Sequence, residues 1–330
     1  MLFDYVSLAG GLVVLIIAGD VLVRGSVGVA QRLGIPNLVI GLTIVAFGTS
    51  APELVISLKA ALEGSGGIAI GNVVGSNIAN VLLVLGMPAL IAATPCGEDG
   101  ATRSATFMVG VTFVFIALCF YSPLGWIASI ILLTLLALFL GASALTARKH
   151  RKEMKANAAE EADDDDDLLE DVEGVPDSIW IAVVYIALGL IGLPLGAHFT
   201  IEGATSVAVA WGVSDAVIAL TVIALGTSLP ELATTVMAAI RQHGAVAIGN
   251  VIGSNIFNLL AIIGITTAVI PVDVPAEILK LDIWVMLACA FILLGLAAFR
   301  VTLGKAMGIA LTGAYCTYIY TVYLFGTANA

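Results

Sequence analysis

The residues best suited to chemistry occur twice in this 330-residue chain, in the same order and with the same spacing. A GTSxPE motif ends at Glu53 in the first copy and at Glu231 in the second. Each is followed by a GNxxGSNxxN motif, which ends at Asn80 and at Asn258. Both pairs are 178 positions apart (53 to 231, 80 to 258), and this fixed offset identifies an internal repeat. Polar groups at this density inside long apolar runs indicate a functional site.

The polar side chains of the two motifs offer oxygen ligands, and neither motif contains His or Cys. Oxygen donors suit hard cations such as Ca²⁺ or Na⁺ and argue against Zn²⁺ or Cu⁺. Two copies facing each other would bring Glu53 and Glu231 together, and two like charges in a membrane need cations, protons or water. Two carboxylates neutralise one Ca²⁺, or two Na⁺ with a third leaving net positive charge. Competition for shared oxygens is a physical basis for exchange rather than for a pore.

The first motif is expected to break its helix. Pro52 lacks an N–H group and clashes with the preceding turn, whereas Ser50 suits an N-cap and Pro52 suits the first turn of a new half-helix. The break frees carbonyl groups near Ala46, and near Ala224 in the second copy, which need partners in hydrocarbon. Glu53 then lies in the first turn, where the helix dipole favours its ionised form.

The second motif predicts a helix with a polar stripe. Asn72, Ser76 and Asn80 follow one another at intervals of four residues and therefore share a face. Gly71 and Gly75 have GxxxG spacing, which permits close approach to the broken helix and serves helix packing equally well. The second copy repeats this pattern at Asn250, Ser254, Asn258, Gly249 and Gly253, and a further asparagine stands beside each stripe, at Asn77 and Asn255.

The composition places these motifs in a membrane. The chain is 60% hydrophobic and 11% charged, against about 25% charged residues in soluble domains. We therefore predict an all-α polytopic membrane protein of about ten transmembrane helices, arranged as two inverted-topology five-helix repeats. The apolar segments lie near residues 6–31, 36–62, 67–92, 104–121, 125–147, 178–210, 214–240, 245–270, 280–299 and 304–325. The first is expected to be a retained helix rather than a signal peptide, because no basic region precedes it.

The charges and cysteines complete the predicted organisation. Residues 1–147 form the first repeat, residues 148–177 a loop with a run of acids, and residues 178–330 the second repeat. The core motifs of the two repeats span 41–86 and 219–264. A charged block of this kind is interpreted as a mobile solvated linker in preference to a regulatory cation sensor. The four cysteines (Cys96, Cys119, Cys289 and Cys316) have no metal-type spacing and are interpreted as small hydrophobic groups.

The distribution of basic residues sets the orientation. With the N-terminus outside, all of the 13 Lys and Arg residues except Lys59 and Lys280 fall at cytoplasmic ends or loops. This predicts a multi-pass plasma-membrane protein with both termini outside and the acidic loop in the cytoplasm. Nothing in the sequence is basic enough to predict nucleic-acid binding. The helices are expected to be surrounded by membrane lipid, and the predicted fold is compatible with a monomer.

The paired motifs resemble the alpha-repeats of the calcium/cation antiporter superfamily, and within it the prokaryotic sodium/calcium exchangers. The resemblance implies that transported Ca²⁺ and Na⁺ are bound by carboxylate, amide, hydroxyl and carbonyl oxygens from Glu53, Glu231, Asn80, Asn258, Ser76, Ser254, Thr49, Thr227, Ser50, Ser228, Ala46 and Ala224. Some relatives, including potassium-dependent exchangers, carry Asp at the position of Asn258. The asparagine here argues against K⁺ co-transport and leaves the Na⁺ stoichiometry open.

The resemblance also implies that the first helix of each repeat slides to gate access. In the first of these helices Asp20 and Arg24 are four residues apart, and His198 and Glu202 occupy the same positions in its copy. These residues form either a gating or proton-sensitive pair, or a local ion pair near a water-filled edge. The spacing favours the local ion pair.

The expected function is secondary active antiport by alternating access, with Ca²⁺ extruded as Na⁺ enters and with no organic cofactor. The nearest alternative is a Ca²⁺/H⁺ antiporter of the same fold, because a paired glutamate could carry protons. A cation channel is a second class, against which the inverted repeat argues. An intramembrane hydrolase is a third, and we expect no enzyme, since a catalytic acid and base need different environments whereas the two glutamates have equivalent ones.

Overall fold

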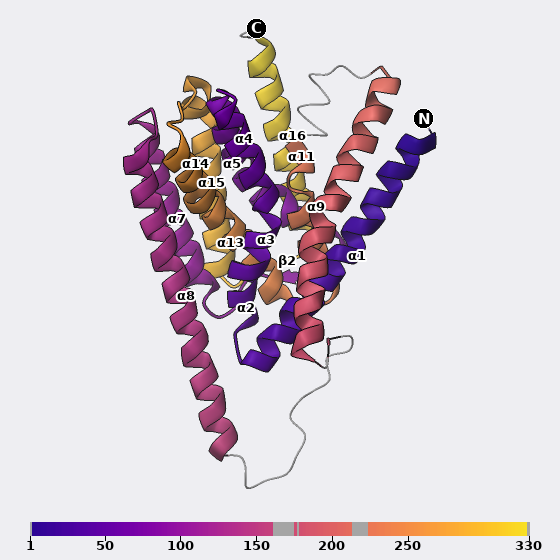
Figure 1. Cartoon of the computed structure of the whole chain (residues 1–330), viewed down its shortest axis with the longest axis vertical. Helices are drawn as coiled ribbons and strands as arrows, with labels where there is room; N and C mark the ends of the chain where they lie inside the picture. The colour runs from indigo at the N-terminus through magenta and orange to yellow at the C-terminus, as the bar shows by residue number, and fades with distance from the viewer. Residues whose placement is uncertain (1, 161–174, 177, 213–223, 329–330) are drawn as a thin grey trace.

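The computed structural model describes residues 2–160, 175–176, 178–212 and 224–328, and these residues are predominantly helical (Figure 1). A short antiparallel ribbon pairs β1 (Thr94–Pro95) with β2 (Thr302–Leu303). The helices of the first half are α1 (Leu2–Leu33), α2 (Asn37–Ile40), α3 (Ala46–Thr49), α4 (Ala51–Leu62), α5 (Gly66–Ala79), α6 (Gly86–Ile91), α7 (Ala101–Cys119) and α8 (Trp126–Glu160), with π-helical turns η1 (Gly41–Val45) and η2 (Asn80–Val84). Those of the second half are α9 (Ile179–Ala210), α11 (Ala224–Gly226), α12 (Leu229–Ile240), α13 (Gly244–Phe257), α14 (Ile263–Val269), α15 (Ile283–Ala298) and α16 (Lys305–Ala328), with π-helical turns η4 (Asn258–Ile262) and η5 (Ile278–Asp282).

The described helices fit a polytopic membrane protein. When helices joined by a π-helical turn are taken together, as in residues 66–91 and 244–269, seven of the described helical stretches are long and apolar enough to cross a membrane. The number is eight if the bent pair formed by residues 37–49 and 51–62 is one span. With the shorter α12 and with α16, they follow the predicted segments in order, so the all-helical membrane fold is confirmed. Residues 214–223 of the seventh predicted helix lie outside the described residues.

The predicted boundaries fail most clearly at α8. This helix continues to Glu160 instead of ending near residue 147, so the first part of the predicted linker is helical. Its polar continuation lacks proline and glycine, the residues that commonly end a helix, and the change from apolar to charged composition was mistaken for a helix end. The acidic stretch 161–174, to which the expected mobility refers, lies outside the described residues.

The helices are arranged with α1 and α9 side by side at one edge and α7 and α8 at the opposite edge, while α3 and α13 lie between them (Figure 1). Glycines permit close contact between α1 and α9, because a Cβ on Gly196 would lie 2.9 Å from the backbone nitrogen of Leu15. Apolar side chains elsewhere on the two helices, such as Ile17 and Ile191, are exposed. This pattern is expected of helices that face lipid.

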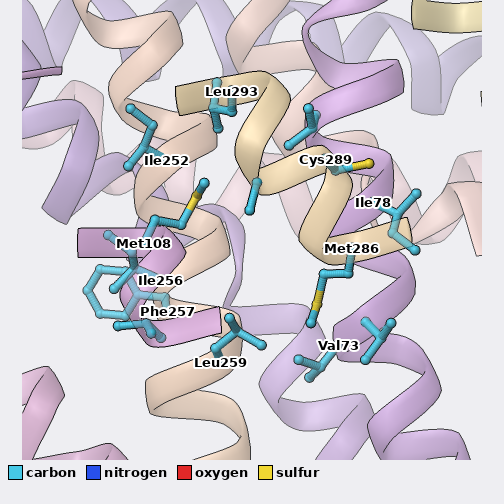
Figure 2. Close-up of a cluster of buried hydrophobic side chains, with 14 of the residues drawn as sticks. Val73, Ile78, Met108, Ile252, Ile256, Phe257, Leu259, Met286, Cys289 and Leu293 are labelled. Atoms are coloured by element: carbon cyan, nitrogen blue, oxygen red, sulfur yellow. The ribbon is translucent and has the colours of Figure 1, made fainter. Parts of the chain in front are cut away.

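Helices α5, α7, α13 and α15 contribute side chains to the larger of two buried apolar clusters. Figure 2 shows Val73 and Ile78 of α5, Met108 of α7 and Met286 of α15 in one buried cluster with side chains of α13. Every residue of α13 from Gly249 to Phe257 is buried. The second GNxxGSNxxN motif is therefore enclosed by protein, so its polar side chains must find partners inside the molecule or bind a ligand.

Candidate ion-binding site

Both GTSxPE motifs interrupt their helices at the serine. In the first copy α3 ends at Thr49, Ser50 has φ −85° and ψ 2°, and the chain continues into α4 with a bend of 43°. In the second copy Ser228 has φ −88° and ψ 4°, and α12 begins at the next residue. The near-identical dihedral angles indicate that the two copies break in the same way. The predicted break is confirmed, with the proline in the first turn of each new helix.

The two acidic residues occupy equivalent buried positions. Glu53 and Glu231 lie in the first turns of α4 and α12, and each is only 1% exposed. The hydroxyl group of Ser50 donates a hydrogen bond to Oε1 of Glu231 over 3.2 Å, so the first broken helix contacts the carboxylate of the second. This bond corrects the prediction for Ser50, which stands at the N-cap position but makes no capping hydrogen bond with its side chain.

The motifs contain buried oxygens that have no hydrogen-bond partner among the described residues. These atoms are Oε2 of Glu53, Oε2 of Glu231, Oδ1 of Asn80, Oδ1 of Asn258 and Oγ of Ser228. A buried unsatisfied group costs about 1–3 kcal/mol, and more if it is charged. In each copy, the glutamate and the last asparagine of the GNxxGSNxxN motif contribute one such oxygen. A hard cation would satisfy these atoms and offset their desolvation.

A hydrogen-bonded clamp holds the backbone beside each carboxylate. The amide nitrogen of Asn72 donates to the carbonyl oxygen of Glu53 over 3.4 Å and to Oγ of Ser57 over 3.0 Å. In the second copy Asn250 makes the same two bonds to Glu231 and Thr235, at the same two distances. Both asparagines were predicted to lie on the polar stripe, but Ser57 and Thr235 were not identified as their partners. Their position four residues after each glutamate, in both copies, could have identified them.

Thr49 links the first broken helix to α13. Its hydroxyl group lies 3.2 Å from Oδ1 of Asn250, 3.5 Å from Oγ of Ser254 and 3.3 Å from the carbonyl oxygen of Ala46. The same carbonyl oxygen accepts the backbone N–H of Ser50 over 3.0 Å. The expectation that the helix break leaves the Ala46 carbonyl group without a protein partner is therefore wrong, because the bend leaves this hydrogen bond intact.

The remaining predicted ligands lie on the same elements. Ser76 on α5 and Ser254 on α13 are buried. Thr227, in the bend of the second broken helix, is buried and lines a cavity of about 170 Å³ together with Ser76 and Tyr318. Ala224 is the first residue of α11, next to residues outside the described part of the chain. The structure thus brings residues from both motifs of both copies into one polar region.

The GxxxG pattern of α13 serves close packing. A Cβ on Gly253 would lie 2.6 Å from the carbonyl oxygen of Leu42 and 2.6 Å from Cβ of Ala46, both on the first broken helix. This confirms the packing interpretation for the second copy. The positions equivalent to Leu42 and Ala46 for Gly71 and Gly75 reach into residues 213–223, which lie outside the described part of the chain.

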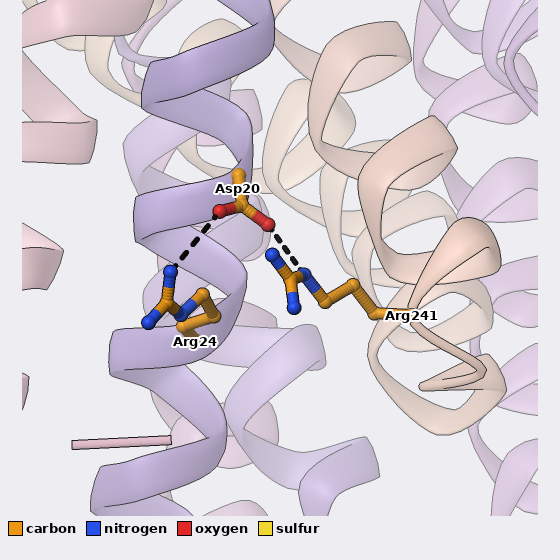
Figure 3. Close-up of polar contacts among 3 residues, drawn as sticks. All are labelled: Asp20, Arg24 and Arg241. Atoms are coloured by element: carbon orange, nitrogen blue, oxygen red, sulfur yellow. Dashed lines mark hydrogen bonds and ion pairs between the residues drawn. The ribbon is translucent and has the colours of Figure 1, made fainter. Parts of the chain in front are cut away.

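The charged pairs of α1 and α9 have different surroundings. His198 and Glu202 are 3.7 Å apart with side chains 70% and 58% exposed, so they form the local pair that the spacing favours. Asp20 likewise lies 3.5 Å from Arg24, but its other carboxylate oxygen lies 2.5 Å from Nε of Arg241 (Figure 3). Arg241 directly follows α12, so Asp20 connects α1 to the helix that carries Glu231. The local interpretation was therefore incomplete for Asp20, since no sequence pattern couples positions 20 and 241.

The cysteines and histidines take no part in this polar region. Cys96, Cys119 and Cys289 are buried and Cys316 is exposed, and burial raises the pKa of the Cys96 thiol to about 12. Among the described residues no group of three or more His, Cys, Asp and Glu side chains could hold a metal ion. A cation in this region would therefore be bound by the two carboxylates and by neutral oxygens.

The fold and the polar region together define a membrane protein suited to hard cations. The family described as "Sodium/calcium exchanger protein" matches residues 3–145 and 181–324, so the chain belongs to this family of membrane cation antiporters.

Individual relatives agree with this assignment. The chain is 32% identical to Sodium/calcium exchanger MaX1 of Methanosarcina acetivorans, with 97% of this chain and 98% of the relative covered. It is also 32% identical to Inner membrane protein YrbG of Escherichia coli, with 98% of each covered. The structure is similar to that of the sodium-calcium exchanger NCX_Mj soaked with 10 mM Na⁺ and 10 mM Sr²⁺, with a TM-score of 0.80, 27% identity and coverage of 97% of this chain and 98% of that one.

Proposed function

We propose that this protein exchanges Na⁺ for Ca²⁺ by alternating access and uses the Na⁺ gradient to extrude Ca²⁺. The observation that carries the proposal is a pair of buried carboxylate oxygens, one on Glu53 and one on Glu231, that have no hydrogen-bond partner in the part of the chain that the structure describes. Each stands at the same position of its repeat, and the donors around them are oxygens. The names of MaX1 and NCX_Mj, both sodium/calcium exchangers, support the same pair of ions.

We assign ion coordination to the polar region formed by both motifs. Glu53 and Glu231 supply the negative charge, and Oδ1 of Asn80 and Oδ1 of Asn258 supply neutral ligands. Hydroxyl oxygens complete the set, from Ser76, Ser254, Thr49, Thr227, Ser50 and Ser228. The carbonyl groups of Ala46 and Ala224 remain predicted ligands, and Ala46 would have to share its carbonyl oxygen with Ser50 and Thr49.

Charge balance explains why the two ions would exclude each other. Two carboxylates neutralise one Ca²⁺, so bound Ca²⁺ leaves no net charge. Two Na⁺ ions give the same balance, and a third would add a positive charge that weakens Ca²⁺ binding further. Because both ions need the same oxygens, each can leave only when the other, or water, replaces it. Ca²⁺/H⁺ exchange at the same site is the second candidate, since two buried adjacent carboxylates could also be neutralised by protons.

We further propose a topology in which residues 1–147 and 178–330 are inverted repeats joined by the loop 148–177. The beginning of α1 and the end of α16 lie at the same end of the molecule, and α8 ends at the opposite end (Figure 1). This arrangement supports termini outside the cell and a cytoplasmic loop, in agreement with the distribution of basic residues. One chain supplies both halves of the site, so a monomer is sufficient for transport.

Uptake of ⁴⁵Ca²⁺ into proteoliposomes tests the coupling. Vesicles loaded with Na⁺ are diluted into Na⁺-free buffer, and parallel samples receive only a pH gradient or external K⁺. The variants are Glu53→Gln and Glu231→Gln. The matched control is Glu63→Gln, which alters a carboxylate at the other end of α4 whose side chain is 64% exposed.

The proposal predicts uptake that requires the Na⁺ gradient, does not need K⁺, is lost in both site variants and persists in the control. Uptake driven by the pH gradient without Na⁺ would assign the protein to proton coupling. Full uptake by Glu53→Gln or Glu231→Gln would refute the assignment of the site.

A further inference from the structure

Asn77 and Asn255 stand beside the polar stripes and form hydrogen bonds between the two copies. The amide nitrogen of Asn80 donates to Oδ1 of Asn255 over 3.0 Å. The amide nitrogen of Asn258 donates to Oδ1 of Asn77, also over 3.0 Å. Each bond thus joins a residue of one copy to a residue of the other, and the pair repeats with the symmetry of the internal repeat.

These two bonds determine which atom of the Asn80 and Asn258 amide groups, the oxygen or the nitrogen, is available to a ligand. A carboxamide group has an acceptor oxygen on one side and a donor NH₂ group on the other. The NH₂ groups of Asn80 and Asn258 donate these bonds, and their Oδ1 atoms accept no hydrogen bond from any residue that the structure describes. If either amide were reversed, it would place its oxygen against the oxygen of Asn255 or Asn77. Its NH₂ group would then occupy the position of the unpartnered oxygen and would repel a cation.

The orientation of Asn77 is itself fixed by the backbone. Its amide nitrogen donates to the carbonyl oxygen of Asn255 over 3.3 Å and lies 3.7 Å from Sδ of Met286. A carbonyl oxygen can only accept, so the NH₂ group of Asn77 must face it and Oδ1 must face Asn258. The carbonyl oxygen of Asn255 therefore fixes the orientation of the Asn77 amide. The Asn77 amide in turn fixes the orientation of the Asn258 amide, whose oxygen remains available.

We propose that Asn77 and Asn255 are positioning residues that hold Asn258 and Asn80 with their oxygens available to the transported cation. The inference rests on the proposed function, since it assumes that Asn80 and Asn258 bind the ion. It adds a reason for the first asparagine of each GSNxxN segment, Asn77 or Asn255. It also explains how the buried amides of Asn80 and Asn258 present their oxygens, and not their NH₂ groups, to a cation. Asn77 and Asn255 are 2% and 3% exposed, so their hydrogen bonds to Asn258 and Asn80 are made away from the molecular surface.

A double-mutant cycle of Ca²⁺ affinity tests this role. The measurement is equilibrium ⁴⁵Ca²⁺ binding to purified full-length protein in detergent, for the parent, Asn77→Leu, Asn258→Asp and the double variant. A carboxylate at position 258 has acceptor oxygens on both sides, so it needs no partner to orient it toward the ion. Asn77→Leu should raise the Kd for Ca²⁺ roughly tenfold in the parent, the effect of losing one buried hydrogen bond. In the Asn258→Asp background it should raise the Kd less than about twofold, or lower it, because it removes the repulsion between two oxygens.

The controls separate positioning from packing and from failure of the site itself. Thr112→Val removes a buried hydroxyl group whose bond, to the Met108 carbonyl oxygen, stays within α7, so the Kd should not change. If Asn77→Leu is not obtained as monodisperse protein, Asn77→Ser replaces it in the cycle. An equal increase in Kd in both backgrounds, or no increase in the parent, would overturn the inference. Glu53→Gln in the same assay tests the proposed site separately: normal Ca²⁺ binding by that variant would refute the site, whereas lost binding with no coupling between positions 77 and 258 would refute only the positioning role.

Discussion

Replacement of Asp20 by Asn should loosen the attachment of α1 to α12. Asp20 is paired with Arg24 and Arg241, and its side chain is 17% exposed while that of Arg241 is 33% exposed (Figure 3). Two charges about 4 Å apart attract by about 4 kcal/mol at the effective dielectric constant near a protein surface. Desolvation and solvent screening reduce this value, since fully exposed pairs contribute about 0–1 kcal/mol and removal of one partner of a buried pair costs about 3–5 kcal/mol. The partial burial here places the expected loss at about 1–2 kcal/mol.

Thermal unfolding of the purified protein in detergent measures this loss. A destabilisation of about 1–2 kcal/mol should lower the Tm by roughly 2–8 °C. The matched control is Asp99→Asn, because Asp99 pairs with Arg300 over 2.8 Å but the two side chains are 94% and 71% exposed. Its Tm should change by less than about 2 °C. Equal changes in the two variants would refute the argument from burial, and so would an unchanged Tm for Asp20→Asn.

Three further outcomes follow from the structure. Gly253→Ala should destabilise the protein by about 1–3 kcal/mol in a denaturation assay, because the new Cβ would lie 2.6 Å from two atoms of the first broken helix. In the control Gly110→Ala, the new Cβ would have no atom of another element within 4 Å, so this variant should be neutral or slightly stabilising. Burial, and then the charge of Arg241, lower the pKa of His243 below its ordinary value of 6.5. As the pH drops below 6.5 the unfolded chain takes up the proton before the folded protein does, so the free energy of unfolding should fall. His243→Gln should reduce this loss of stability in melting curves recorded from pH 7 to 5. Ca²⁺ at about 100 times its Kd should stabilise the protein by about 2.7 kcal/mol, and Glu231→Gln should abolish that shift in Tm.

The helix breaks could be predicted because their causes are local. Proline removes a hydrogen-bond donor and limits its neighbour wherever it stands, so the bends at Ser50 and Ser228 followed from the motif. The burial of the two glutamates followed from the apolar runs around them. Because of the internal repeat, each feature predicted in one copy was also predicted at the equivalent position of the other copy.

The partners of the polar side chains could not be predicted in the same way. Ser50 was expected to cap its own helix, but its hydroxyl group donates to Glu231, which is distant in the sequence and reaches it only when the two copies pack. The same is true of Asp20 and Arg241. Local spacing identifies which groups share a helix face, whereas contacts between faces depend on how the helices cross. The end of α8 was missed for a different reason, since a polar helix that leaves the membrane has no hydrophobic signal to mark its length.

We propose above that buried oxygens of both copies form one cation site between Glu53 and Glu231. The most direct test is a crystal structure of the protein soaked in Sr²⁺, an electron-dense substitute for Ca²⁺, with the ion located by its anomalous scattering. We expect a peak in contact with both carboxylates and with Oδ1 of at least one of Asn80 and Asn258, at oxygen distances slightly longer than the 2.3–2.6 Å typical of Ca²⁺. A fully bound Sr²⁺ ion elsewhere in the protein, with no peak at the two glutamates, would contradict it.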